Sequence, residues 1–390
     1  MQFLSEFLEQ AKACDLYRRT VTCDPVAPGH VRINGQTYLL LSSNNYLGLT
    51  HHPELQQAAV KATLTYGTGS GGSRLTTGTH PLFDELEPAL ARFKGTEAAL
   101  VFNTGYMANL GVISALAGPD DVLFSDEWNH ASIIDGCRLS RAQTVIYRHA
   151  DMADLHGLLQ GTVCRGKRLI VTDGVFSMDG DIAPLPAIAD LAEKYHALLI
   201  VDDAHATGVL GPGGQGTAAH FGIKHKVQVQ IGTLSKALGA EGGFVAGSKE
   251  LIEYIKNKAR SFIFSTALAP ATIAAALAAL RQLSAGPDMV NKLSENANYV
   301  RSLLQAAGMP VPGGVTPIIP IMVGEAGAAV RLADELYKQG IIITAIRPPT
   351  VPCGTSRLRL TVIAAHERDE LRQAVETITA RARQFGMVVG

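Results

Sequence analysis

Short apolar runs rich in β-branched residues alternate with longer segments of helical spacing through the middle of the chain. The runs are AALVF, DVLF, TVIY, RLIVTD, ALLIVDD, VQVQIG and GFVAG, and the segments between them include MANLGVISALAG and PLPAIADLAEKYH. Strands that alternate with helices are typical of βαβ units, in which the strands are parallel and helices cover both faces of the sheet. The pattern therefore predicts an α/β fold with a mostly parallel sheet.

The pattern changes at both ends of the chain. After about Ala285, a helix, the runs TPIIPIMVG, IIITAIR and RLRLTVI, and an amphipathic segment from His366 onward predict a smaller α+β unit. Near the start, MQFLSEFLEQAKACDLYRR has helical spacing, and YLLLSS predicts a strand. The expected organisation is an N-terminal arm at 1–49, a large α/β domain at 50–285 and a small C-terminal α+β domain at 286–390.

The composition of the chain argues against several classes of function. The 34 basic and 35 acidic side chains nearly balance, which gives no sign of nucleic-acid binding. Five cysteines are scattered without a CxxC pair, so we expect no disulfide framework, no metal site and a cytoplasmic location. The uncharged segment 261–280 contains Pro270 and several polar residues, so we expect a packed helix and no membrane partner. Two matches to GxGxxG, GTGSGG and GPGGQG, do not support a dinucleotide fold, because the first follows a helix and the second leads into no clear crossover helix.

The stretch GTLSKALGAEGG places Lys236 among small residues at the end of an apolar run. Small neighbours allow a planar ligand to approach closely, and a desolvated lysine loses its proton readily, so such an amine suits a Schiff base. A surface lysine in a glycine-rich loop would have the same local sequence. Other stretches must therefore decide between the two interpretations.

Polar residues directly follow three of the apolar runs, which is where ligands bind in open parallel sheets. They are Asp202, Asp203 and His205 after ALLIV, Asp173 and Ser177 after LIVT, and Asn103, Thr104 and Gly105 after AALVF. Each group alone could be an Asx turn or a helix N-cap. Together, a carboxylate, an imidazole, a helix N-terminus and a lysine on the next strand suit a cationic heteroaromatic ring that bears a phosphate.

A series of motifs runs in order from near residue 40 to near residue 365 and comprises SSNNYLGL, YGTGSGGSRLTTGTH, FNTGYMAN, WNHASIIDG, VTDGVFSMDGDIAPL, VDDAHATGVLG, GTLSKALGAEGG, FIFSTALAP and IRPPTVPCGTSRLRLT. In these stretches the chain resembles the α-oxoamine synthases, which have the aspartate-aminotransferase-like type I fold of pyridoxal 5'-phosphate enzymes. The resemblance implies pyridoxal 5'-phosphate as cofactor, amino acid and acyl-CoA substrates, and a homodimer with shared active sites.

The resemblance also implies roles for individual residues. Lys236 would carry the cofactor as a Schiff base and later take the substrate's α-proton, and Asp202 would keep the pyridinium nitrogen protonated. His205 would bond to the phenolic oxygen. His130 would stack on the ring, although outside this motif it could be a turn histidine satisfied by the backbone. Phosphate contacts would fall to Gly105, Tyr106, Ser177, Thr233 and, from the neighbouring subunit, Thr266.

For the amino-acid carboxylate, the resemblance points to the guanidinium fork of Arg359, with Asn44 assisting. Arg357 and Arg359 share one face of an alternating strand, so both could instead be solvated. The remaining expected substrate contacts are Arg18, which Arg19 could replace, Ser73, His130 and Thr350.

The activity implied by the resemblance is decarboxylative condensation of an amino acid with an acyl thioester, with release of CoA and carbon dioxide. Ser73 leaves room for a substrate methyl group, which favours L-alanine over glycine, and IRPPTVP resembles synthases that use a pimeloyl group on CoA or a carrier protein. The alternatives are a glycine C-acetyltransferase or another α-oxoamine synthase, an aminotransferase, and a non-catalytic regulatory or scaffold subunit.

Overall fold

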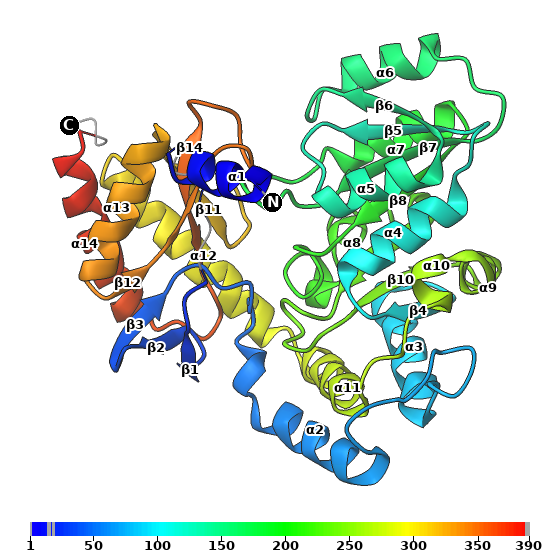
Figure 1. Ribbon diagram of the computed structural model, residues 1–390, viewed down its shortest axis with the longest axis horizontal. Helices are drawn as coiled ribbons and strands as arrows, with labels where there is room; N and C mark the ends of the chain where they lie inside the picture. The colour runs from blue at the N-terminus through cyan, green and yellow to red at the C-terminus, as the bar shows by residue number, and fades with distance from the viewer. Residues whose placement is uncertain (1, 14–16, 18–19, 387–390) are drawn as a thin grey trace.

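The fold is organised around a seven-stranded sheet (Figure 1). The computed structural model describes residues 2–13, 17 and 20–386. The strand order is β4-β10-β9-β8-β7-β5-β6, and every strand is parallel except β10, which is antiparallel to both neighbours. The strands are β4 (Ala98–Phe102), β5 (Val122–Asp126), β6 (Gln143–Tyr147), β7 (Arg168–Asp173), β8 (Ala197–Asp202), β9 (Val229–Thr233) and β10 (Gly243–Gly247). The predicted mostly parallel sheet is therefore confirmed.

Successive residues of the central strands face opposite sides of the sheet and enter two separate hydrophobic cores. In β7, Leu169 and Val171 pack with α4 and α5, whereas Ile170 packs with α6 and α7. Burial on both faces explains why the runs are apolar throughout and do not alternate. The first face is covered by α4 (Gly105–Leu116), α5 (Ala131–Ser140), α9 (Lys249–Lys258) and α10 (Arg260–Ile263), and the second by α6 (Met152–Gly161), α7 (Leu185–Lys194) and α8 (Thr217–His220).

A third cluster lies at the β4 edge, where α2 (Pro53–Tyr66), α3 (Pro81–Lys94) and α11 (Pro270–Ala285) pack together. Each of these helices has proline in its first turn, where the missing N–H group costs no hydrogen bond. The helices α4, α6 and α9 begin instead with the side-chain caps Thr104, Asp151 and Ser248. In the described part of the chain, none of the helices has both the length and the hydropathy to cross a bilayer.

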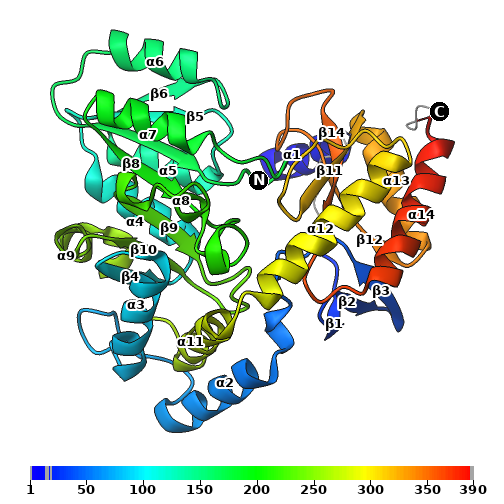
Figure 2. The same ribbon diagram turned by 180° about the vertical axis from the view of Figure 1, so that it is seen from behind.

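The last part of the chain forms a second unit beside the sheet (Figures 1 and 2). Its antiparallel sheet has the order β11-β14-β13 and packs with three helices. The strands are β11 (Ile318–Gly324), β13 (Thr344–Ile346) and β14 (Ser356–Thr361), and the helices are α12 (Asp288–Ala306), α13 (Ala326–Lys338) and α14 (Arg368–Gln384).

Strands from the start of the chain pair with this second unit. The order β1-β2-β3-β12 brings β12 alongside β3 in parallel, although about 300 residues separate them. Part of the predicted arm at 1–49 thus shares a sheet with the range 286–390, and the three predicted domain ranges stay a prediction. These elements are β1 (Asp24–Ala27), β2 (His30–Ile33), β3 (Gln36–Leu40) and β12 (Ile341–Ile342), and the chain also contains α1 (Gln2–Ala13) and the short 3₁₀ helices η1 (Leu49–His51), η2 (Pro212–Gly214) and η3 (Lys224–Lys226).

A fully buried ion pair joins α3 to the loop after β8. Lys94 Nζ lies 2.7 Å from Asp203 Oδ2, and neither side chain is exposed. Lys94 also donates to the carbonyl oxygen of Gln215, and Asp203 accepts from the N–H and hydroxyl groups of Thr217. Such a pair is tolerated because both charges are satisfied, and removal of one partner leaves the other uncompensated.

Replacement of this lysine should destabilise the protein. Lys94→Met should lower the free energy of unfolding by about 3–5 kcal/mol, because Asp203 would stay buried without its counter-ion. Chemical denaturation followed by circular dichroism measures the change. Lys226→Met, which removes a surface contact with Asp190, is the matched control and should hardly move the unfolding midpoint. Equal effects of the two substitutions would contradict the prediction.

Candidate active site

Two carboxylates end neighbouring strands of the large sheet. The register pairs Asp173 of β7 with Asp202 of β8, and both side chains are buried. Asp202 accepts hydrogen bonds from Asn109 Nδ2 at 2.6 Å and from the N–H group of Ala204 at 2.8 Å. Asp173 accepts from the N–H group of His130 at 2.7 Å. Burial and the neighbouring Asp202 raise the pKa of Asp173 well above its usual range, which favours its protonated form.

A tight turn after β9 presents Lys236 to these carboxylates. The turn is closed by a hydrogen bond from the N–H group of Leu234 to the carbonyl oxygen of Gly242 at 2.9 Å. Within it, Gly239 has a φ of 61°, and a Cβ there would lie 3.0 Å from backbone atoms of Leu49 and Thr50. The small residues after the lysine are therefore needed so that this turn can pack closely.

The amine of Lys236 is half-buried and lies 2.8 Å from Nε2 of His205. Burial lowers the pKa of Lys236 to about 8, although the nearby carboxylates act in the opposite direction. Burial, reinforced by Lys236 and Arg359, holds the pKa of His205 well below its usual range, so this imidazole is neutral. With Nε2 accepting from the lysine, Nδ1 carries the ring proton and donates to Tyr46 Oη at 2.7 Å.

His130 is the N-cap of α5. Its Nδ1 accepts from the N–H group of Ser132 at 3.2 Å and lies 2.8 Å from Ser132 Oγ, so Nε2 carries the proton of the neutral ring. The amide of Asn109 donates to Ser132 Oγ at 2.9 Å as well as to the strand-end carboxylate. The ring of Tyr106 lies edge-on to His130, and its hydroxyl donates to Asp135. The alternative in which His130 is a turn histidine bonded to the backbone is thus correct for Nδ1, yet His130 is still exposed.

Arg359 of β14 brings a buried cation to the site. It donates to the carbonyl oxygen of Ser177, to Thr361 Oγ1 at 3.0 Å and to Asn44 Oδ1 at 3.2 Å, all of which are neutral acceptors. No carboxylate among the described residues forms an ion pair with it, and an uncompensated buried cation is costly unless a ligand supplies the anion. The alternative in which both arginines are solvated is wrong, since Arg357 is 4% and Arg359 is 6% exposed.

Donors suited to a phosphate lie at the start of α4. Thr104 caps this helix by accepting from the N–H group of Met107 at 3.0 Å. A Cβ on Gly105 would lie 3.3 Å from the Cβ of Thr233, so the helix start and the end of β9 are in close contact. The hydroxyl of Thr233 lies 2.6 Å from that of Ser235. Hydroxyls beside a helix N-terminus can bind an anion.

Among the described residues, Ser73, Thr266 and Thr350 make no hydrogen bond or ion pair with Lys236, His205, Asp202 or Arg359, although the carbonyl oxygen of Thr266 accepts from Asn103 Nδ2, just before α4, at 2.7 Å. Ser73 and Thr266 form an isolated antiparallel bridge with each other. Thr350 is exposed, and its N–H group bonds back within its own loop. Arg18 and its alternative Arg19 lie outside the described residues. The predicted roles of all these residues stay predictions.

Similarity to known proteins agrees with this geometry. The family model "Aminotransferase class I and II" matches residues 36–378. The chain belongs to this family. An 8-amino-7-oxononanoate synthase from Trichlorobacter lovleyi is 51% identical over 390 residues, which is 100% of both chains. The predicted resemblance to α-oxoamine synthases and the predicted type I fold are therefore confirmed.

Solved structures support the same grouping. A serine palmitoyltransferase from S. paucimobilis, determined with bound PLP and myriocin, matches with a TM-score of 0.92 and 32% identity over 99% of this chain and 98% of its own. An 8-amino-7-oxononanoate synthase from Francisella tularensis matches with a TM-score of 0.78 and 31% identity over 90% of this chain and 99% of its own. The likeness thus extends over nearly the whole length of these relatives.

Sequence reasoning missed three polar residues that support the site of this family member. Asn109 is a buried amide in an otherwise apolar helix, and that contrast was the available signal. Tyr46 and Ser132 lie in motifs that resemble the family, but nothing local marked their hydrogen bonds to His205 and His130. Their roles depend on which elements the fold brings together.

Lys236 should be unusually nucleophilic at moderate pH. Because burial lowers its pKa to about 8, its acylation rate by acetic anhydride should reach half of the plateau near that pH. Competitive labelling of the ligand-free chain between about pH 6 and 11, read by mass spectrometry, measures the midpoint against about 10.4 for an ordinary lysine. Lys94, buried against Asp203, is the control and should stay unlabelled while the protein is folded. An ordinary midpoint for Lys236 would refute the prediction.

Proposed function

We propose that the chain condenses L-alanine with a pimeloyl thioester to give 8-amino-7-oxononanoate, carbon dioxide and CoA, as a pyridoxal 5'-phosphate-dependent acyltransferase of biotin biosynthesis. The observation that carries this proposal is the half-buried amine of Lys236 beside the neutral His205 and the buried carboxylate of Asp202, with the unpaired cation of Arg359 in the same site. The full-length identity of 51% to an 8-amino-7-oxononanoate synthase supports the substrate pair.

The residues of the site fit the cofactor. Asp202 offers a buried carboxylate, hydrogen-bonded only to neutral donors, to a protonated ring nitrogen. His205 offers a neutral imidazole to a phenolic oxygen, and Lys236 offers an amine to an aldehyde. The start of α4 at Gly105 and the hydroxyl of Thr233 offer donors to a phosphate, and a Cβ on Gly105 would crowd this cradle.

Bound there, pyridoxal phosphate supplies an electron sink for the charge that develops at the substrate's α-carbon. Lys236 Nζ removes the α-proton, since a pKa of about 8 leaves much of the amine neutral near that pH. His205 orients this amine without adding a competing positive charge. Arg359 would bind the substrate carboxylate, with Asn44 holding one arm of its guanidinium, and His130 has an Nε2 proton free for donation.

We also infer a homodimer with shared active sites. Ser73 and Thr266 pair with each other and make no hydrogen bond to Lys236 or Arg359 among the described residues, which suits residues that serve the site of a second copy. In support, α2 exposes the apolar side chains of Val60 and Leu64, the latter 83% exposed. A cytoplasmic location stays a prediction from the cysteine pattern.

Borohydride should fix the cofactor covalently to Lys236, and peptide mapping should locate the label there. Lys236→Ala should still bind the cofactor weakly but lose turnover by several orders of magnitude, because the attachment point and the base disappear together. Lys224→Ala is the matched control and should retain activity, since Lys224 only contacts Gln215. A label on Lys224 or Lys226, or turnover by Lys236→Ala, would exclude this assignment.

CoA release should be fastest with L-alanine and pimeloyl-CoA. The measurement compares initial rates for L-alanine, glycine and L-serine with pimeloyl-, acetyl-, succinyl- and palmitoyl-CoA. One methyl group in a pocket is worth about 1–3 kcal/mol, so alanine should exceed glycine by at least several-fold in kcat/KM. If glycine with acetyl-CoA were the best pair, the substrate assignment would fail while the cofactor chemistry stood.

A further inference from the structure

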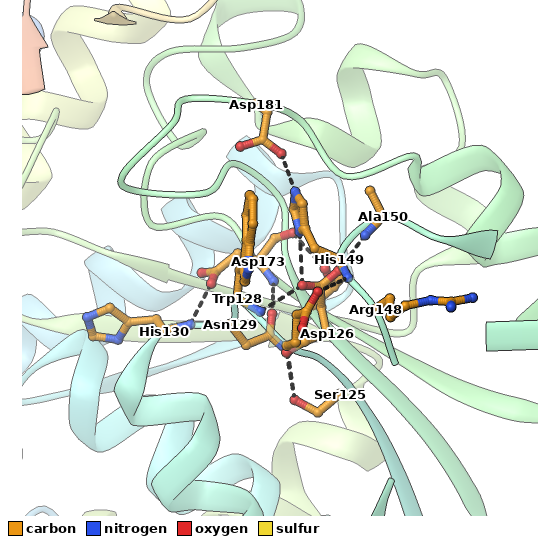
Figure 3. A network of polar contacts seen from close by, with 12 residues as sticks. Ser125, Asp126, Trp128, Asn129, His130, Arg148, His149, Ala150, Asp173 and Asp181 are labelled. Atoms are coloured by element: carbon orange, nitrogen blue, oxygen red, sulfur yellow. Dashed lines mark hydrogen bonds and ion pairs between the residues drawn. The ribbon is translucent and has the colours of Figure 1, made fainter. Parts of the chain in front are cut away.

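His149 follows β6, outside the residues assigned above, and both of its ring nitrogens face carboxylates (Figure 3). Nδ1 lies 3.0 Å from Asp126 Oδ1, and Nε2 lies 2.9 Å from Asp181 Oδ2. A neutral imidazole has only one N–H group, so two carboxylate acceptors call for an imidazolium that donates from both nitrogens. The side chain of His149 is 14% exposed and that of Asp126 is 2% exposed, whereas that of Asp181 is 37% exposed, so the Asp126 side of the cluster is the one shielded from water.

Aromatic side chains hold the imidazolium on two sides. The ring of Trp128 stacks on His149, with centroids 3.9 Å apart and planes inclined by 14°. Phe176 lies edge-on to His149 at 4.4 Å. A cation against the face of an indole is attracted by its quadrupole. Trp128 is the only tryptophan of the chain, so tryptophan fluorescence reports on this position alone.

The same cluster holds the backbone on both sides of the imidazole. Asp126 also accepts from the N–H groups of Trp128 at 2.9 Å and Ala150 at 3.0 Å. Ala150 has a φ of 53°, a left-handed conformation that alanine rarely adopts and that the surroundings must maintain. His149 donates its own N–H group to Glu127 at 2.8 Å. The turn after β5 is thus tied to the residues after β6.

From this turn the contacts lead directly to His130. Asn129 donates to the carbonyl oxygen of Val171 at 2.9 Å and accepts from the N–H group of Asp173 at 2.8 Å. The next residue, His130, donates its N–H group to the carboxylate of Asp173 (Figure 3). The three consecutive residues Trp128, Asn129 and His130 are therefore anchored one after another.

On its other side, His149 contacts the loop at 177–181. Asp181 of this loop bonds to the imidazole, and Asp179 forms an ion pair with Arg357 of β14. The carbonyl oxygen of Ser177 accepts from Arg359. The loop therefore contacts both the imidazole and the arginine to which we assign the substrate carboxylate.

We propose that His149 is a positioning residue, which is clamped between Asp126 and Asp181 so that it holds the Trp128–His130 turn at the cofactor site and fastens that turn to the loop that contacts Arg359. It touches no reacting atom and acts through His130 and Arg359. The benefit to catalysis rests on the proposed function, whereas the clamp itself is tested without turnover.

Protonation of His149 should persist above neutral pH. Burial alone would lower the pKa of His149, but the hydrogen bonds from its ring to Asp126 and Asp181 raise it to about 9. The other charged groups that face it are Asp179, in the same loop as Asp181, and Glu127, in the turn after β5. Because the folded pKa lies above the unfolded value of about 6.5, the clamp's stabilisation is complete below that pH and is lost as the pH rises through about 9.

The first experiment follows the fluorescence of Trp128 in the full-length chain against pH. A protonated imidazole quenches a stacked indole, so the intensity should be low at neutral pH and rise with a midpoint near pH 9. His149→Gln should abolish this transition. Asp181→Asn, a milder change in a partly exposed loop, should move the midpoint down by about 1–3 pH units. His225→Gln, at an exposed histidine in η3, is the matched control and should leave the curve unchanged.

The second experiment adds pyridoxal 5'-phosphate to the same proteins. His149→Gln should bind the cofactor about tenfold more weakly and lose part of its visible circular dichroism, because the Trp128–His130 turn loses one of its anchors while the bonds of Asn129 and His130 to Val171 and Asp173 remain. The KM for L-alanine should also rise, and kcat/KM should fall by up to about a hundredfold, as misplacement of a site group by 1 Å can cause. His225→Gln should match the unmodified chain in every measurement.

The outcomes separate this inference from the proposed function. Absence of a transition near pH 9 in the unmodified chain, or its persistence in His149→Gln, would overturn the clamp. The positioning role would be overturned if the unmodified chain showed the transition but His149→Gln kept the cofactor affinity and the circular dichroism of the unmodified chain. Failure of the unmodified chain to release CoA from every substrate pair would count against the proposed function alone, since fluorescence and circular dichroism require no turnover.

Discussion

The parallel register of β7 and β8 places two buried carboxylates, Asp173 and Asp202, at the same level of the sheet. Burial, reinforced by repulsion from Asp202, raises the pKa of Asp173 well above its usual range. The surrounding groups compensate for the pair. Asn109 donates to Asp202, the N–H group of His130 donates to Asp173, and Lys236 brings an opposite charge. Because burial nevertheless lowers the pKa of Lys236 to about 8, desolvation outweighs the attraction of both carboxylates and leaves a reactive amine.

The two arginines of β14 differ in whether a carboxylate of the described protein pairs with their positive charge. Arg357 and Arg359 are both buried and face the same side of one strand, yet in the described part of the chain only Arg357 has a carboxylate partner, Asp179. The acceptors that the described residues offer to Arg359 are all neutral. A buried cation without a counter-ion lowers the stability of the ligand-free protein, and a bound anion restores it. The 177–181 loop contacts both arginines and His149, so under the proposed function it would support the residues assigned to the substrate and those assigned to the cofactor.

Much of the fold could be predicted because strands buried on both faces are apolar throughout, and all seven predicted runs lie in strands of the large sheet. The antiparallel direction of β10 was also within reach, since the connection from Thr233 to Gly243 is too short for a helical crossover. The pairing of β3 with β12 had no local signal. In the site, Lys236, Asp202 and His205 were recognisable by their places after apolar runs, whereas the role of Asn109 emerges only when α4 packs on the sheet.

The adjacent residues Asp202 and Asp203 have different surroundings: Asp202 lies in the candidate site, and Asp203 forms a buried ion pair that stabilises the fold. Successive side chains at a strand end point to opposite faces, so Asp202 meets Asn109 of α4 and Asp203 meets Lys94 of α3. Asp203, which supports the fold, is neutralised by Lys94. Among the described residues, Asp202 accepts hydrogen bonds only from neutral donors, and Arg359 donates only to neutral acceptors. A site in which, among the described residues, one buried anion and one buried cation form no ion pair suits a ligand with both charges. A protonated heteroaromatic ring at Asp202 and an amino-acid carboxylate at Arg359 satisfy that requirement together.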